Sequence, residues 1–523
     1  MKNIFLLLLF SISAFLNAQN YIPDVSFGGI GSVVTNYNKY YDNDQAPRNV
    51  FFENNKYIFT QKTQLSCFNY DGTVDYNFGT LGYSRIIIPN CSDCPIIIKS
   101  SKIINNNIFV FGKMQDSNSI LLYGFIAKMS IDGILDTTFG NNGIVTINIG
   151  NLYSNDPFSD GITDIVYKND NYFAIGSIVY TDNVIRRNLF AVKMNINGIV
   201  NLDFDSSGLK KFTSIDGNSA EKIYDYNDGL LIIGNISNNN TTSEHSVTFI
   251  QIDEYGSLNS TFGNNGLKKI VLIDGLCACG SSFKECNLIN NDLYYNLTFG
   301  SMSGGYDKIQ KIDISTLETI NTLNSLSIVD FATINNSAVT KYLVDVDKIY
   351  ILDCINNCQP DFNITRRNLD GTLDTTFNQT GTYSYSFPQP NSFTTTYDSA
   401  SVLIKDNNDR ILIGGYTSAQ LYTTAPYRGF AMLRIKDETF SNNEFRNNDF
   451  TLSPNPVRSI LNIENSNDII IDTITIFNVL GKIVYYSDKP LQKINLETLN
   501  EGLYFVKIKS GNKNDSFKII KTN

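Results

Sequence analysis

The sequence predicts an all-β protein, a seven-bladed β-propeller of four-stranded blades followed by a small Ig-like β-sandwich. Three observations predict this fold. A turn motif, Asp-x-x-Phe-Gly, recurs along most of the 523 residues, and four short β-like runs accompany each copy. After residue 450 the motif stops and short alternating runs follow, which indicate a smaller antiparallel domain. A series of β-sandwiches is the alternative, because regular strand spacing fits either architecture.

The N-terminal segment, residues 1–18, has the features of a secretory signal peptide. Lys2 supplies a positive charge, an unbroken apolar run follows from Ile4 to Phe10, and Ala18 is a small residue at the expected cleavage site. A transmembrane anchor is the alternative, but the apolar run is shorter than the roughly 20 residues that a span requires. We therefore expect export across the inner membrane.

The repeated motif organises the middle of the chain. Its aromatic residue falls at six positions: Phe27, Phe78, Phe139, Phe204, Phe262 and Phe377. The last interval is about twice the others, so a degenerate seventh copy is expected near residue 320. The repeats resemble the delta-60 repeat family, a propeller-like group of secreted bacterial proteins, and this resemblance implies a fold but no activity. We assign residues 19–440 to the propeller and residues 441–449 to a linker.

The two ends of the predicted blades differ. Each blade is expected to begin with the strand after a motif, such as 144–149, and to close with the strand before the next motif, such as 189–195. Short Asn- and Asp-rich turns and the motif itself then lie at one end, and long, variable connections lie at the other. This second end is the candidate interaction face. Its loop residues that could stack on sugars are Tyr40, Tyr41, Tyr153, Tyr422, Tyr427 and Arg428.

The eight cysteines predict disulfides, because the count is even and the protein is exported. The candidates all fall in the long connections: Cys91, Cys94, Cys277, Cys279, Cys286, Cys354 and Cys358. Cys91–Cys94 and Cys354–Cys358 are plausible local pairs, although sequence does not fix the connectivity. A zinc site at Cys91-x-x-Cys94 and free thiols are the alternatives.

Composition narrows the chemistry. A single histidine, His245, placed in a connection, allows at most one histidine-based catalytic group, and the net charge of −10 argues against nucleic acid or anionic membranes as partners. Paired carboxylates could still hydrolyse glycosides, and Asp156, Asp160 and Asp361 lie in long connections, but no spacing selects a pair. No cofactor is identified. The segment 203–208 faintly resembles a calcium loop but aligns with the repeated turn, so calcium stays an open alternative.

Residues 450–523 carry a further resemblance. The pieces that match begin with Pro454, Asn455 and Pro456, continue through Gly481 and Lys482 and through Gly502 and Tyr504, and end with Lys518 and Lys521. In this order and spacing they closely resemble the type A sorting domain of the bacterial type IX secretion system. The resemblance implies that the type IX machinery is a partner and that the chain is attached to the outer cell surface or released. An ordinary C-terminal sandwich module is the alternative.

These features predict an exported propeller that acts as a non-enzymatic binding or adhesion scaffold for a glycan or a protein. A carboxylate-based polysaccharide hydrolase or lyase on the same propeller is one alternative. A structural surface component without a discrete pocket is another. No nucleic-acid partner and no transmembrane span are expected.

Overall fold

The computed structural model describes residues 19–522 apart from a set of gaps. The gaps are 36–45, 89–93, 116–120, 152–160, 182–184, 207, 213–217, 238–244, 272–280, 300–305, 315–327, 336–337, 355–360, 389–394, 421–426, 438–449, 466–470, 479–481, 490 and 511–512. The chain divides into two compact units, one up to Asp437 and one from Glu438. The described residues contain no α-helix, so the all-β prediction is confirmed. None of them forms a helix long and apolar enough to cross a membrane.

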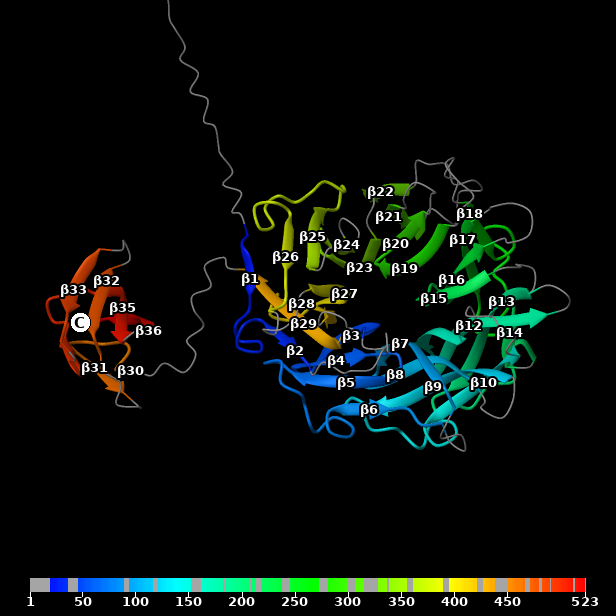
Figure 1. The fold of residues 1–523 in the computed structure, drawn as a ribbon, viewed down its shortest axis with the longest axis horizontal. Helices are drawn as coiled ribbons and strands as arrows, with labels where there is room; N and C mark the ends of the chain where they lie inside the picture. The colour runs from blue at the N-terminus through cyan, green and yellow to red at the C-terminus, as the bar shows by residue number, and fades with distance from the viewer. Residues whose placement is uncertain are drawn as a thin grey trace, which may run out of the picture. The chain divides into compact units, whose positions relative to one another are not determined.

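The first unit consists of antiparallel sheets that follow one another along the chain (Figure 1), and all but the last contain four consecutive strands. The first three sheets are β3 (Asn49–Glu53), β4 (Lys56–Thr60), β5 (Gln64–Asn69) and β6 (Tyr83–Arg85); β7 (Ile96–Ile104), β8 (Asn107–Gln115), β9 (Leu121–Ser130) and β10 (Ile144–Asn151); and β11 (Gly161–Lys168), β12 (Asn171–Thr181), β13 (Ile185–Asn195) and β14 (Leu209–Lys211). The next three are β15 (Asn218–Tyr226), β16 (Gly229–Ser237), β17 (His245–Ile252) and β18 (Leu267–Val271); β19 (Ser281–Ile289), β20 (Asp292–Phe299), β21 (Tyr306–Asp313) and β22 (Ile328–Asn335); and β23 (Ala338–Asp345), β24 (Lys348–Cys354), β25 (Phe362–Asn368) and β26 (Thr382–Tyr385).

The grouping of strands into sheets differs from the predicted grouping by one strand. In the copies from Asp75 onward, the strand after the motif pairs with the strand before that motif, as β10 pairs with β9 across Asp136 and Phe139. The motif therefore lies within a sheet, and the long connection that follows leads to the next sheet. The physical reason is that the motif is a compact turn, which returns the chain antiparallel onto the strand it has just left.

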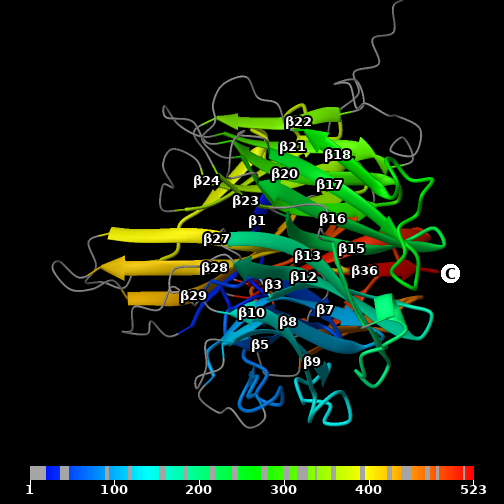
Figure 2. The same cartoon turned by 90° about the vertical axis from the view of Figure 1, so that its right-hand side faces the viewer.

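The last sheet of the first unit joins the two ends of the chain. Its strands β27 (Thr395–Lys405), β28 (Ile411–Gln420) and β29 (Tyr427–Asp437) run side by side (Figure 2). Two N-terminal strands, β1 (Tyr21–Pro23) and β2 (Ser32–Val34), pair with β29 and complete the sheet. Because the first strands of neighbouring sheets also contact one another, for example β27 with β3, the arrangement is propeller-like.

Apolar side chains fill the space between successive sheets. Phe139 of the motif is 1% exposed and packs against Phe109 and Tyr172, with ring centres 5.8 and 6.1 Å away. These residues come from two neighbouring sheets, so burial of the motif aromatic stabilises one sheet against the next.

The second unit contains two sheets around one apolar core. One is formed by β30 (Phe450–Ser453), β31 (Ile460–Asn465) and β34 (Lys493–Asn495). The other has the strand order β33 (Ile483–Ser487), β32 (Thr473–Asn478), β35 (Gly502–Ser510) and β36 (Lys513–Lys521). Leu461 and Ile494 of the first sheet meet Ile474, Val506 and Ile519 of the second in the core. Alternating inward apolar residues explain both sheets.

Candidate functional site

The repeated motif forms the same turn in all six copies. In the copy that begins at Asp136, Oδ1 accepts the backbone N–H of Thr138 at 3.1 Å, and the Asp136 carbonyl accepts the N–H of Phe139 at 3.0 Å. The N–H of Gly143 then donates to the Phe139 carbonyl at 2.8 Å. The equivalent three bonds occur in every copy, including the two that begin with asparagine instead of aspartate. The first residue of the motif is therefore used as a turn cap.

Four of the described motifs, those of Phe27, Phe78, Phe139 and Phe204, also attach their sheet to the following one. The residue after the motif aromatic donates its N–H to a turn of the next sheet, as Gly79 does to the Asp132 carbonyl at 2.8 Å. A glycine of that turn lies against the aromatic ring. A Cβ added at Gly133, where φ is +76°, would come within 2.6 Å of Phe78 Cζ. The motif is thus a structural joint between sheets.

Motif carboxylates are neutralised by cations of the same sheet. Lys128 Nζ lies 2.9 Å from Asp136 Oδ2, and Arg366 Nε donates to Asp374 Oδ2 at 2.8 Å. The Thr138 and Lys128 hydrogen bonds lower the pKa of Asp136. Where the motif begins with Asn259, the partner is the neutral Gln251, whose Oε1 accepts Asn259 Nδ2 at 3.1 Å. In these three copies a cation of the strand faces a motif aspartate, and a neutral amide of the strand faces a motif asparagine.

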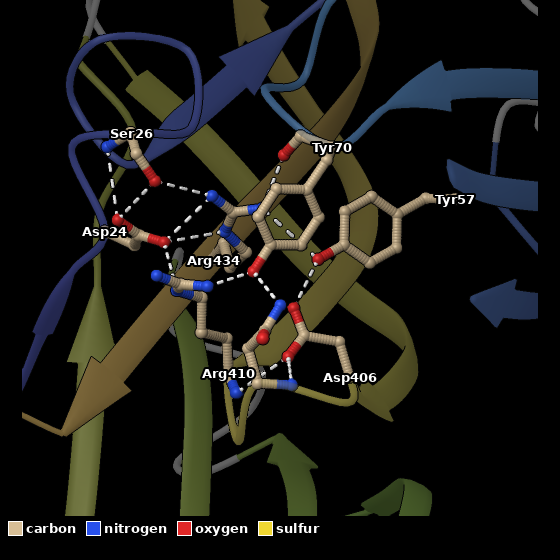
Figure 3. Close-up of polar contacts among 8 residues, drawn as sticks. Asp24, Ser26, Tyr57, Tyr70, Asp406, Arg410 and Arg434 are labelled. Carbon is tan, nitrogen blue, oxygen red and sulfur yellow. Dashed lines mark hydrogen bonds and ion pairs between the residues drawn. The ribbon is translucent and has the colours of Figure 1, made fainter. Parts of the chain in front are cut away.

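The same pair occurs where the two chain ends meet (Figure 3). Arg434 of β29 is fully buried, and its Nε and Nη2 contact Asp24 Oδ2 at 2.9 and 2.8 Å. Nη2 also donates to Ser26 Oγ at 2.8 Å, and the guanidinium lies 4.1 Å from the ring centre of Tyr70. Burial alone would raise the pKa of Asp24, but the Ser26 hydrogen bonds and the Arg434 charge together hold it below its usual value.

Further polar groups surround this pair. Arg410 Nε lies 2.8 Å from Asp24 Oδ2, and Arg410 Nη1 donates to the hydroxyl of Tyr70. The Tyr57 hydroxyl donates to Asp406 Oδ2 at 2.8 Å. Asp406 Oδ1 in turn accepts the N–H of Arg410 at 3.0 Å. Because these groups are buried or half-buried and are bonded to one another, the cluster stabilises the sheet in which the two ends of the unit meet.

The faint calcium loop is explained by the same turn. Phe204 is the buried motif aromatic, Asp203 N–H donates to Asn201 Oδ1 at 2.9 Å, and Asp205 Oδ1 pairs with Lys210 Nζ at 2.9 Å. No group of three or more potential metal ligands occurs among the residues that the structure describes.

One buried carboxylate was missed by sequence reasoning. Asp398 of β27 is 2% exposed, and its Oδ2 accepts the N–H of Phe387 at 3.2 Å. Burial raises the pKa of Asp398 to about 6, against the opposing effect of the nearby Thr417 hydroxyl and of the Phe387 hydrogen bond. Ser386, the residue before Phe387, donates to Asp361 Oδ1. The consecutive residues Ser386 and Phe387 thus hold Asp361 close to Asp398. Asp361 is one of the three candidate carboxylates; the other two, Asp156 and Asp160, lie outside the described residues.

The predicted binding-face residues are only partly described. Tyr40, Tyr41, Tyr153 and Tyr422 lie outside the described residues. Tyr427 and Arg428 were expected in a loop, but both belong to β29, where they pair with Ala419 and Ser418. His245, also expected in a connection, is the first residue of β17 and pairs with Ser237. The strands extend further than predicted because Thr and Tyr also favour extended backbone.

Two cysteines predicted in long connections, Cys286 and Cys354, belong to strands. Cys286 was expected in a connection as a disulfide partner, but it lies within β19 as a buried free thiol, and burial raises its pKa. Its neighbours alternate as in a half-buried strand, which points the thiol into the core. Cys67 is likewise free and buried. Cys94 is buried, Cys354 ends β24, and Cys91, Cys277, Cys279 and Cys358 lie outside the described residues, so their pairings stay predictions.

A pocket of about 510 Å³ lies at the end of the fourth sheet that carries the fixed turns. It is lined by Asn227, Asp228 and part of the motif segment 251–262. Asp253 Oδ1 already accepts the N–H groups of Tyr255 and Ser257. The described lining therefore brings together no set of free catalytic groups.

In the second unit, the Pro454–Pro456 segment, which begins the sorting-domain pattern, is hydrogen-bonded to the 518–521 segment, which ends it. Asn455 lies between Pro454 and Pro456, each preceded by a cis peptide bond. Its Nδ2 donates to the Lys518 carbonyl and its Oδ1 accepts the N–H of Ile520, both at 2.9 Å. Two backbone bonds between Val457 and the chain end, 2.8 and 2.9 Å long, continue this contact. We call this contact the Asn455 clamp; it holds β36 at its C-terminal end.

Other predicted sorting residues support the same sheet. Gly502 begins β35 opposite Lys521, and its φ of +152° is the positive range that favours glycine. The Tyr504 hydroxyl donates to the Asn500 carbonyl at 2.9 Å and fixes the turn before β35. Lys482 N–H donates to Asn478 Oδ1 at 3.0 Å, and Gly481 lies outside the described residues.

A family model matches this unit over residues 451–522, and its description is the secretion system C-terminal sorting domain. Residues 451–522 are a secretion system C-terminal sorting domain. This match confirms the predicted sorting domain of the type IX secretion system. The protein is therefore secreted and is attached to the outer cell surface or released.

The remaining comparisons concern the fold. No curated protein sequence matches the chain. The chain is similar to Drosophila Semaphorin 2a (8% identity, 90% of this chain and 97% of that chain, TM-score 0.43). It is similar to PorZ, a surface component of the type IX secretion system of Porphyromonas gingivalis (9%, 92% and 82%, 0.23). It also resembles the extracellular domain of a two-component system protein of B. thetaiotaomicron (11%, 0.40), covering 97% of this chain but only 59% of that one. These values are too low to assign a function.

The Asn455 clamp has a consequence for the sorting domain. The last strand, β36, is an edge strand, because among the described strands it pairs with β35 alone. The clamp adds bonds on its free side, where Val457 bridges to Lys521. The start and the end of the sorting domain therefore depend on each other, which explains why both pieces belong to the recognisable pattern.

Proposed function

We propose that residues 19–440 form a closed seven-bladed propeller of delta-60-like repeats that serves as a non-enzymatic binding or adhesion scaffold. In this proposal residues 1–18 are a signal peptide cleaved after Ala18, 441–449 are a linker, and 450–523 fold as an Ig-like sandwich. The succession of four-stranded sheets and the pairing of N-terminal strands with β29 support ring closure.

One observation carries the binding role. The turn motifs at one end of the sheets use their carboxylates in their own caps and ion pairs, so that end serves the fold. The connections at the other end differ in length and sequence from sheet to sheet. Recognition residues concentrate in variable loops on a rigid scaffold, and Tyr40, Tyr41, Tyr153 and Tyr422 are the proposed contacts for a glycan or protein.

The test is a glycan array and a polysaccharide-turnover screen on the mature protein. We expect binding to at least one glycan class without turnover, and loss of that binding in a Tyr40→Ala/Tyr41→Ala variant. A matched change at the other end, Tyr76→Ala, should leave binding unchanged, because Tyr76 is an exposed residue of a motif turn. Turnover would contradict the non-enzymatic role, and absence of both activities would exclude a sugar ligand.

Asp398 and Asp361 favour a second candidate, a carboxylate-based hydrolase or lyase. A carboxyl group whose pKa is raised to about 6, close to a second carboxyl group, is the kind of pair that glycoside hydrolysis uses. If this candidate is right, the turnover screen gives a product, and Asp398→Asn and Asp361→Asn each abolish it. Turnover that survives both substitutions would exclude the pair.

Disulfides are proposed for the Cys91–Cys94 and Cys354–Cys358 pairs. Peptide mapping without reduction should find both linkages, and Cys67 and Cys286 should be alkylated only after unfolding, because both thiols are buried.

A further inference from the structure

One surface of the sorting domain is an open sheet face with an unusual composition. The sheet β33-β32-β35-β36 turns one side to the core and the other to solvent. The register places Ile483, Phe477, Phe505 and Lys518 in one row across the four strands on the outer side. We call this outer side, with its neighbouring positions, the exposed sheet face.

The exposed sheet face is apolar at one end. Ile483 is 54% exposed, and Phe505 and Ile520 are each 42% exposed. Leu503 pairs with Ile520 beside the row, and Tyr486 lies at the edge on β33. Directly opposed side chains of neighbouring strands lie about 5 Å apart, so these residues form a continuous apolar strip. Such a strip on a small soluble domain indicates a contact surface.

The other end of the exposed sheet face is basic. Lys507 and Lys509 of β35 are exposed there, and Lys518 of β36 is exposed at the end of the apolar row, one row away from Lys507. None of the described strand residues on this side is acidic. Residues 450–523 carry 9 Lys and Arg and 7 Asp and Glu, which give a net charge of +2. Residues 1–449 carry the remaining 32 Lys and Arg and 44 Asp and Glu, which give a net charge of −12. The sorting domain is therefore the basic part of an acidic protein.

The opposite sheet of the domain provides an internal comparison. On β30-β31-β34 the outward residues include Ile460, Glu464, Lys493 and Asn495, so one apolar side chain stands among mixed charges. Thr451 Oγ1 donates to Glu464 Oε2 there at 3.4 Å. An apolar strip beside an unpaired basic end is thus a property of one face and not of the whole domain.

We propose that the exposed sheet face is the surface by which the sorting domain docks on the type IX machinery, and that its partner is an acidic protein surface with an apolar patch. Phe505, Phe477 and Ile483 would supply the buried centre of the contact. Lys507, Lys509 and Lys518 would steer and orient it through complementary charge. An acidic polysaccharide fits the lysines but leaves the apolar strip in water, so a protein fits the face better. The acidic first unit of the same chain is a competing occupant that the test separates.

The test uses the full chain in a bacterium with a working type IX system. One variant reverses the basic end (Lys507→Glu/Lys509→Glu/Lys518→Glu), and a second removes apolar area (Ile483→Thr/Phe505→Thr). The matched control changes the opposite sheet (Ile460→Thr/Lys493→Glu). We expect the exported fraction of each face variant to fall about tenfold or more, with periplasmic accumulation, as for loss of interface anchors. The control should export like the wild type. Export of both face variants at the wild-type level would overturn the proposal.

A cross-linking measurement keeps the proposal testable if a variant misfolds. A photoreactive amino acid placed at Phe505 should form an adduct with an identified component of the type IX machinery, and one placed at Ile460 should not. An adduct only with residues 19–437 of the same chain, only with polysaccharide, or equally from both positions would overturn the proposal.

Discussion

Replacing Arg434 by methionine tests how the first unit closes. Arg434 is fully buried and Asp24 is 1% exposed, and the substitution removes two contacts to Asp24 Oδ2 together with the bond to Ser26. Removing one partner of a buried ion pair costs about 3–5 kcal/mol. Because Arg410 Nε still lies 2.8 Å from Asp24, we expect a loss near the lower end, about 3 kcal/mol in the free energy of unfolding.

Two matched variants give the scale for this value. Arg366→Met removes the partner of Asp374 in the preceding sheet, where both groups are less than 5% exposed and Lys348 stays as a second cation. It should cost nearly as much as Arg434→Met. Lys128→Met removes a pair whose side chains are 16% and 26% exposed, so it should cost about 1 kcal/mol or less.

The assay is urea unfolding of the mature protein. The chain has no tryptophan and 30 tyrosines, so tyrosine fluorescence and far-ultraviolet circular dichroism are the signals. Hydrogen exchange should show the earliest loss of protection in β1 and β2 of Arg434→Met. If Arg434→Met costs no more than Lys128→Met, or if β1 and β2 stay protected, the closure does not depend on the buried pair.

Three further predictions concern local features. Asn455→Ala removes both side-chain bonds of the Asn455 clamp, so the free energy of unfolding of the sorting domain should fall by about 1–3 kcal/mol. The control Asn462→Ala removes one bond to the Ser453 carbonyl and should cost less. Protease trimming of β36 compares the two variants, and equal trimming would contradict the clamp. The pKa of Asp398 is raised from 3.8 to about 6, so the folded state binds more protons and stability falls as pH rises through this window. Asp398→Asn should therefore gain up to about 3 kcal/mol at pH 8 and little at pH 4 in unfolding experiments, and a gain independent of pH would contradict the assignment. Gly133→Ala should lower the free energy of unfolding by about 1–3 kcal/mol, because the added Cβ would meet the Phe78 ring. Gly29→Ala, at a similar positive φ but with open space around the Cβ, should cost less. Equal losses of stability would show that backbone strain alone is responsible.

Sequence alone predicted the features that depend on local pattern. The six motif aromatics are recognisable because each turn needs the same capping residue, aromatic and glycine, and all six rings are buried. The sorting motif was found in the same way. The grouping of strands was wrong by one strand, because the pairing partner of a strand after a turn depends on the geometry of that turn. Cys286 was misplaced, although its alternating neighbours in β19 contain the signal for an inward-facing residue.

Long-range pairings could not be predicted. Asp24 and Arg434 are 410 positions apart, and no sequence pattern near either residue indicates that the two form a pair. The role of Arg434 becomes visible only when β1 and β2 are placed on β29. Asp398 was missed for a similar reason, because its burial depends on the segment at Phe387, which belongs to the preceding sheet connection.

The most direct test of the export assignment is deletion of residues 450–523, followed by fractionation of a bacterium with a working type IX system. The sorting domain predicts that the truncated protein accumulates in the periplasm in folded form, whereas the full chain reaches the cell surface or the medium. Surface display of the truncated protein at the level of the full chain would contradict the assignment.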